Sequence, residues 1–105
     1  MDADELKKIV ELHLRWINNE PDGVKADLSD VDLSRVNFDY DNLSNANLSN
    51  AKFYKTDFGL ADLSGANLSG TGLYYADFFS ANLQGTDFCN ADLSYANLNF
   101  ARGCW

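Results

Sequence analysis

The chain has 105 residues, of which 46% are hydrophobic, and a formal net charge of −8. This length suits one domain, and the apolar fraction is typical of a folded protein rather than a disordered one. The negative charge argues against nucleic acid as a partner, because binding phosphate groups requires a cationic surface.

An amphipathic helix is predicted over residues 3–19. Asp2 followed three positions later by Glu5 has the pattern of a capping box, and Pro21 and Gly23 mark the end of the helix. One face of this helix carries its apolar residues and the single histidine: Leu6, Ile9, Val10, His13, Trp16 and Ile17.

Such a face needs a surface to cover, and the segment that follows is adjacent. We therefore expect residues 1–25 to form an N-terminal cap, in which the helix covers the beginning of the next segment. Ile9 and Trp16 are the side chains expected over its first apolar positions, Leu28, Val31 and Leu33. His13 lacks a catalytic or metal-binding partner in the sequence, so we expect it to be packed as a structural residue.

From Ala26 to Phe100 the sequence divides into fifteen consecutive units of five residues without an insertion or deletion. The central residue of every unit is Leu or Phe. The residue two positions earlier is Ala in nine units, Thr in three, Val in two and Asp in one. The residue between them is Asp or Asn in all units except two, which have Lys52 and Gly72.

This spacing predicts short extended segments joined by regular turns. Residues two apart in an extended segment point to the same side, so the small residue and the Leu or Phe face inward together while Asp or Asn faces outward. Turn-forming residues dominate the last two places of most units. Similar residues recur twenty positions apart, which favours four segments per coil: Phe38/Phe58/Phe78, Tyr54/Tyr74, Tyr75/Tyr95 and Arg35/Lys55.

The A(D/N)LXX motif resembles the pentapeptide-repeat family, and the resemblance covers residues 26–100. It implies a β-solenoid, a right-handed quadrilateral parallel β-helix of about four coils over residues 26–105, with the N-terminal α-helical cap before it. Carried over to this chain, the resemblance implies four inward columns: Leu28, Leu48, Leu68 and Phe88; Leu33, Phe53, Leu73 and Leu93; Phe38, Phe58, Phe78 and Leu98; Leu43, Leu63 and Leu83.

Asp41 breaks the pattern, because it occupies an inward position that elsewhere holds a small uncharged residue. A lone carboxylate is costly there. Either it is a binding or switching acid, or its oxygens accept hydrogen bonds from backbone donors near the junction with the helix.

The C-terminal end also departs from the repeat, since Gly103 stands where Leu or Phe is expected. Phe100, Cys104 and Trp105 either fold over the last coil as a cap or form a contact with a second copy of the chain. The resemblance supports the second alternative, because relatives in the family often dimerise end to end through their C-terminal coils. A third alternative is that the natural chain continues past Trp105.

No constellation in the sequence predicts catalysis. There is no Ser/His/Asp or Cys/His arrangement and no Gly-rich phosphate loop before a helix. We therefore expect no enzyme activity and no cofactor. We also expect no membrane partner, because no apolar run is long enough to span a bilayer. Cys89 and Cys104 lie in no CxxC pattern, and together with the absence of an expected signal peptide they favour the cytoplasm.

Two functions remain. The first is a rigid module that binds an unknown protein partner through its outward apolar side chains: Tyr40, Tyr54, Leu60, Tyr74, Tyr75, Phe79, Tyr95 and Phe100. The alternative is that these side chains only stabilise the coils. The second is mimicry of DNA toward a type II topoisomerase, as in the fluoroquinolone-resistance proteins of the family. Mimicry is disfavoured by charge. After residue 25 the chain has ten Asp against four Lys and Arg, a net charge of −6, whereas a DNA duplex as long as the expected solenoid, about 18 Å, carries roughly ten negative charges. The chain also lacks the loops of those proteins.

Overall fold

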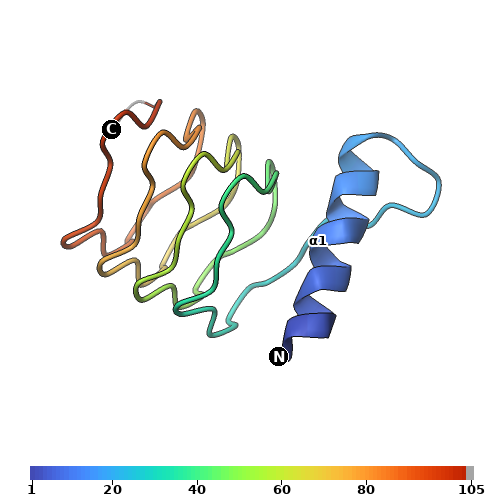
Figure 1. Ribbon diagram of the computed structural model, residues 1–105, viewed down its shortest axis with the longest axis horizontal. Coiled ribbons are helices and arrows are strands. Elements are labelled where there is room, and N and C mark those ends of the chain that lie inside the picture. Colours follow the sequence, from blue (N-terminus) through green and yellow to red (C-terminus); the bar gives the residue numbers. More distant parts are fainter. Residues whose placement is uncertain (104–105) are drawn as a thin grey trace.

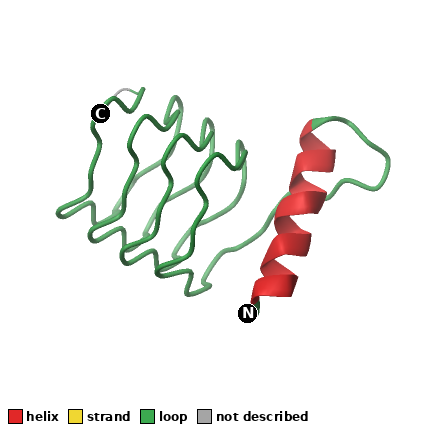
Figure 2. Cartoon of the chain, viewed as in Figure 1, coloured by secondary structure: helices red, strands yellow, loops and turns green. Residues whose placement is uncertain are grey.

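The computed structural model describes residues 1–103, and its extents are 38 × 26 × 21 Å. Helix α1 (Ala3–Ile17) lies at one end, and residues 26–103 wind into a solenoid whose coils follow one another away from the helix (Figure 1). The solenoid contains isolated bridges rather than extended strands, so it is drawn as loop throughout (Figure 2).

The ends of α1 follow from local hydrogen bonds. The Asp2 carboxylate accepts a hydrogen bond from the backbone N–H of Glu5, which caps the first turn as predicted. The helix ends at Ile17, two residues earlier than predicted, because Asn18 is its C-cap and Asn19 has a positive φ of 57°.

The chain then doubles back closely along the helix. The backbone N–H of Val24 donates to the carbonyl of Leu12 at 3.0 Å. Gly23 lies so near the helix backbone that a Cβ there would stand 2.2 Å from the nitrogen of Trp16. This close approach requires glycine and directs the chain into the first coil.

Parallel bridges join residues twenty positions apart along the whole solenoid, from Asp27 with Asn47 to Asn82 with Arg102. Each inner coil hydrogen-bonds to both of its neighbours. In the middle, the Asp57 N–H donates to the Val36 carbonyl at 3.0 Å and the Phe58 N–H donates to the Asp77 carbonyl at 2.7 Å. Twenty residues therefore make one turn of the coil, the same distance at which similar side chains recur in the sequence.

Each unit ends in a turn whose last residue has a positive φ, for example Arg35 at 66° and Tyr75 at 61°. The residue after the turn donates back to the central carbonyl, as Val36 does to Leu33 at 3.2 Å. In twelve units the outward Asp or Asn also accepts the N–H two positions later, as Asp92 does from Ser94 at 3.0 Å. The outward Asp and Asn side chains thus fix the turns.

The core is a set of stacked central residues. Phe58 is parallel to Phe38 and Phe78, with ring centroids 5.3 and 5.0 Å apart, and it meets Phe53 edge to face at 5.2 Å. The twelve central residues from Leu28 to Leu83 are buried. All fifteen central residues are predicted to face inward and so to be buried, but the last three have no described coil stacked beyond them and are only half-buried: Phe88, Leu93 and Leu98.

The small inward residues lie beside this core. The Ala residues from Ala26 to Ala81 at these positions are buried. Threonine fits there because its hydroxyl donates to a backbone carbonyl, as Thr56 does to Leu33 at 2.8 Å and Thr71 to Leu68 at 2.6 Å. A polar residue at this position is therefore tolerated when a carbonyl is within reach.

Candidate functional site

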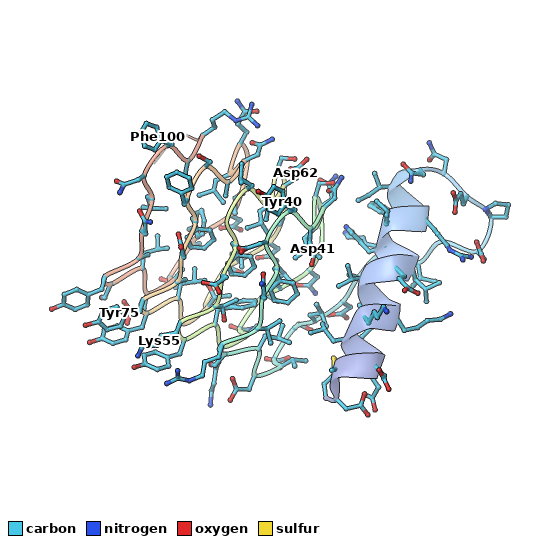
Figure 3. All side chains as sticks on the ribbon, viewed as in Figure 1. Tyr40, Asp41, Lys55, Asp62, Tyr75 and Phe100 are labelled. Atoms are coloured by element: carbon cyan, nitrogen blue, oxygen red, sulfur yellow. The ribbon has the colours of Figure 1, made fainter. Side chains whose placement is uncertain are left out.

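The predicted partner residues lie along two neighbouring series of turns. We call the first the tyrosine corner, formed by Tyr54, Tyr74, Tyr75 and Tyr95, and the second the apolar corner, formed by Tyr40, Leu60, Phe79 and Phe100. All eight side chains are exposed, and the exposed fraction is largest for Phe100 at 80% and Tyr40 at 77%. In Figure 3, Lys55 and Tyr75 lie along the lower edge of the solenoid, and Tyr40 and Phe100 along its upper edge.

The tyrosine corner is a continuous cluster of rings from three successive coils. Tyr54 stacks on Tyr74 at 5.8 Å, and Tyr75 stacks on Tyr95 at 5.1 Å between ring centroids. Tyr74 and Tyr75 meet edge to face at 4.6 Å and join the two stacks. Neighbouring rings at these distances hold one another in place while their outer faces stay exposed.

Cations extend this cluster toward α1. The Arg35 guanidinium lies 5.3 Å from the Tyr54 ring centroid, and the Lys55 ammonium lies 5.4 Å from Tyr54 and 6.0 Å from Tyr75. These distances are in the range of cation–π contacts. Positive charge and aromatic surface therefore occur together on a protein whose net charge is negative.

The apolar corner is looser. Among the described residues its ring contact is between Phe79 and Phe100, whose centroids are 5.6 Å apart and nearly perpendicular. Tyr40 and Leu60 stand on the two coils closer to α1. The four side chains form a row along the solenoid rather than a compact cluster.

A polar strip separates the two corners, because the outward residues of the face between them are Asn37, Asp57, Asp77 and Asn97. Asn97 donates to the Asp77 carboxylate at 3.1 Å. Some loss of hydration, together with the negative charges of Asp39 and Asp77, raises the pKa of Asp57 above its usual value.

The surface as a whole is thus an acidic strip with an aromatic border on each side. Such a surface offers apolar contact and hydrogen-bond acceptors.

His13 is fully buried at the junction of α1 and the first coil, as the sequence predicts. Its Nδ1 accepts from the backbone N–H of Ala26 at 2.9 Å, so the hydrogen is on Nε2, which donates to the Ser44 carbonyl at 2.8 Å. Both ring nitrogens are occupied by backbone groups. His13 is therefore a structural residue rather than a catalytic one.

Trp16 does not pack on the core over Leu28, Val31 and Leu33 as predicted, although it lies beside Ser44 and Asn45 of the first coil. Its ring instead stacks on the His13 ring at 5.4 Å, and Lys25 lies over it at 5.9 Å. Ile9, with Leu6 and Val10, does pack against the core. The helix face is turned so that Ile9 meets the solenoid while Trp16 shields the histidine.

Asp41 is half-buried, and burial with the nearby Asp39 charge raises the pKa of its carboxyl above the usual value. The expected backbone donors are missing, since no hydrogen bond to this carboxylate is present among residues 1–103. Its inward position faces a cavity under α1 instead of a row of N–H groups.

Within residues 1–103 no group of three or more His, Cys, Asp or Glu side chains is placed to hold a metal ion. Helix α1 is too short and too polar to cross a membrane. Cys104 and Trp105, expected as part of a C-terminal cap or dimer contact, lie outside the described residues.

Sequence reasoning missed two features of these sites. It noted the recurrence of Arg35 and Lys55 but did not connect them with the tyrosines, although the twenty-residue spacing that aligns Lys55 with Tyr75 was available. It singled out Asp41 but not the cavity beside it, which depends on where α1 lies and has no signal in the repeat.

The family is decided by comparison with family models. The model described as pentapeptide repeats matches residues 42–73 and 73–102, more than half of the chain. The chain belongs to the pentapeptide repeat family. A search of curated proteins finds no match for this pentapeptide repeat protein.

One solved structure superposes well on this chain, and two further pentapeptide repeat proteins match it in sequence. The pentapeptide repeat protein alr5209 from Nostoc PCC 7120 is 25% identical, covers 90% of this chain and 72% of its own, and superposes with a TM-score of 0.78. HetL from Nostoc sp. strain PCC 7120, a pentapeptide repeat protein involved in heterocyst differentiation regulation, is 34% identical over 73% of this chain and 44% of its own, with a TM-score of 0.26. Rfr23 from Cyanothece 51142 is 24% identical over 89% and 92%, with a TM-score of 0.34. The family match and the superposition on alr5209 together show the right-handed β-helix of this family.

Proposed function

We propose that this pentapeptide repeat protein is a non-enzymatic, rigid cytoplasmic module that binds a partner protein on the face between the tyrosine corner and the apolar corner. One observation carries the proposal. All eight exposed large apolar side chains of the turns lie in these two neighbouring series, whereas the other two series, within the described residues, carry Ser, Asn, Asp, Gly, Gln and Cys.

This distribution suits protein recognition. Aromatic residues are enriched in interfaces, and tyrosines supply large contact areas at low entropic cost because few bonds rotate. The stacked rings of the tyrosine corner are already ordered, so a partner would not need to immobilise them. The acidic strip between the corners favours a partner segment that carries Lys or Arg.

The proposal includes a four-sided solenoid of about four coils, closed at its N-terminal end by α1. The contacts of Leu6, Ile9 and Val10 with the core support this capping role, as do the two hydrogen bonds of His13. Deleting residues 1–20 should expose the first coil, lower solubility and lower the melting temperature. A truncated protein that stays monomeric and equally heat-resistant would contradict the capping role.

Affinity capture from the lysate of the source cell tests the binding function. The wild type is compared with the double variant Tyr74→Ala/Tyr75→Ala, with Gln84→Ala on a polar series of turns as the control. We expect a specific protein that the wild type and the control retain and that the double variant loses.

Stability must be measured on the same samples. If the double variant binds the same proteins but melts at a lower temperature, the tyrosines serve to hold the coils together and the proposal fails. If it loses the partner at an unchanged melting temperature, recognition is their role.

A further inference from the structure

A cavity of about 590 Å³ lies between α1 and the first coil. Its walls are mainly apolar and come from both sides of the junction: Leu6, Val10 and Leu14 from the helix, and Leu33, Val36 and Phe38 from the coil. This volume is within the range of small-molecule sites, roughly 300–1,000 Å³.

Asp41 is the residue that distinguishes this cavity. It lines the wall from an inward position that holds Ala, Thr or Val in the other fourteen units. In Figure 3 it lies at the end of the solenoid that faces α1. Whereas the inward threonines donate to backbone carbonyls, the Asp41 carboxylate has no hydrogen bond or ion pair within residues 1–103. It has therefore lost part of its hydration without gaining a partner.

The charges around the cavity are mostly negative. Asp2, Glu11 and Asp32 line it together with Asp41, and Lys7 is the single Lys or Arg among the lining residues. An anionic ligand would be repelled by these carboxylates. A bare metal ion is also a poor fit, because no cluster of ligating side chains is present in the described part of the chain.

We propose that this cavity binds a small organic cation, a protonated amine on an apolar body, whose ammonium group donates hydrogen bonds to the Asp41 carboxylate. The apolar body would fill the space between Leu6, Val10 and Val36. An ammonium–carboxylate hydrogen bond is charge-assisted and is strengthened where part of the water is excluded. The site is at the opposite end of the solenoid from Phe100, and it shares Asn37 with the polar strip of the proposed protein-binding face.

Benzylamine serves as the probe, and benzyl alcohol is its neutral counterpart of similar shape. Each is titrated into the 13C-labelled full chain, and the methyl signals of Leu6, Val10 and Val36 are followed by NMR. We expect benzylamine to shift these signals saturably and to bind about tenfold more tightly than benzyl alcohol, because hydrogen bonds to charged groups are the stronger ones.

Two matched variants test the role of Asp41. Asp41→Asn keeps the size of the side chain and removes the charge, and it should lower benzylamine affinity to that of benzyl alcohol. Asp62→Asn removes an outward carboxylate one coil away, where Asn is an ordinary residue of the repeat, and it should bind benzylamine as the wild type does. If Asp41→Asn does not fold, Asp41→Ala replaces it, since Ala is the commonest residue at this position.

Several results would overturn the proposal. These are equal affinities for amine and alcohol, undiminished affinity in Asp41→Asn, and shifts that occur only outside the cavity. Shifts of the same methyl signals that depend on protein concentration without any ligand would show that a second copy of the chain fills the cavity, and that result would also reject it.

Discussion

His13 in α1 donates a hydrogen bond from Nε2 to the carbonyl oxygen of Ser44, 2.8 Å away in the first coil. Its Nδ1 accepts a hydrogen bond from the N–H of Ala26. If Nδ1 were protonated, two N–H groups would face each other and this hydrogen bond would be lost. Burial lowers the pKa of His13 below its usual value and the Lys25 charge lowers it further, while the bond to Ser44 acts in the opposite direction. The helix is thus attached to the solenoid through a neutral histidine.

This attachment predicts that stability depends on pH. The unfolded chain binds a proton on His13 near pH 6.5, while the folded chain does so only at a lower pH. The contribution of His13 is therefore complete above about pH 6.5 and is lost as the pH falls below it. Urea denaturation between pH 7.5 and 5.5 should show a decline in the wild type.

The variant His13→Gln is the control for this decline. It should be less stable than the wild type at pH 7.5 and should show little change over the same pH range. An equal decline in His13→Gln would assign the pH dependence to other groups.

Replacing Asp41 by Ala should stabilise the protein by about 1 kcal/mol at pH 7, since a half-buried carboxylate without a partner is removed. The raised pKa of Asp41 means that the folded state takes up its proton more readily than the unfolded state. The gain should therefore shrink as the pH falls through that raised pKa toward 3.8. Denaturation at pH 7 and pH 4 measures it, and a loss of stability at pH 7 would show that Asp41 has a favourable partner.

Phe58→Ala should destabilise the protein by about 3–5 kcal/mol, because the ring is buried between Phe38 and Phe78 and leaves a cavity that both neighbours line. Phe88→Ala is the matched comparison on the last coil. Its half-buried ring should cost roughly half as much to remove. Chemical denaturation measures both, and a loss below about 1 kcal/mol for Phe58→Ala would mean that the central rings do not form a packed stack.

A weak end-to-end dimer is the expected assembly. Phe88, Leu93 and Leu98 are half-buried on the last described coil, while Leu6, Ile9 and Val10 of α1 pack against the core at the opposite end, so we expect a two-fold contact between the C-terminal coils. The contact area is limited to one cross-section of the solenoid, so the affinity should be modest. Light scattering at rising concentration should show the mass increase toward two chains, and Trp105→Ser should reduce the increase. A mass of one chain throughout would reject the dimer.

The inward core could be predicted because its physical cause is local. A Leu or Phe every fifth position, with a small residue two before it, is sufficient to define the inward side of an extended segment. The same local reasoning failed at the last coil, where burial of Phe88 depends on a neighbouring coil rather than on its own unit. The prediction for Trp16 was wrong for a similar reason, because its packing against His13 depends on how α1 lies on the solenoid rather than on a local pattern.

The outward residues were only partly predictable. The outward direction of these side chains followed from the repeat. The hydrogen bonds that Asp92 and its equivalents accept from the N–H two positions later were not predicted, although Asp and Asn are known to form such turns. The partners of His13 lie 13 and 31 positions away in the sequence. No local pattern could have paired them.

The twenty-residue spacing of the bridges also limits how this surface can change in evolution. Tyr54 is aligned with Tyr74, so deletion of one unit between them, such as residues 61–65, would align Tyr54 with Phe79 instead. Every later side chain would move to the adjacent face while the interior stayed filled with Leu and Phe. Gain or loss of four units, in contrast, would lengthen or shorten the tyrosine corner by one step and leave its neighbours in phase. Insertion or deletion of one unit thus rearranges the outward side chains while the core keeps its composition. Insertion or deletion of four units keeps their arrangement and changes only the length of the solenoid.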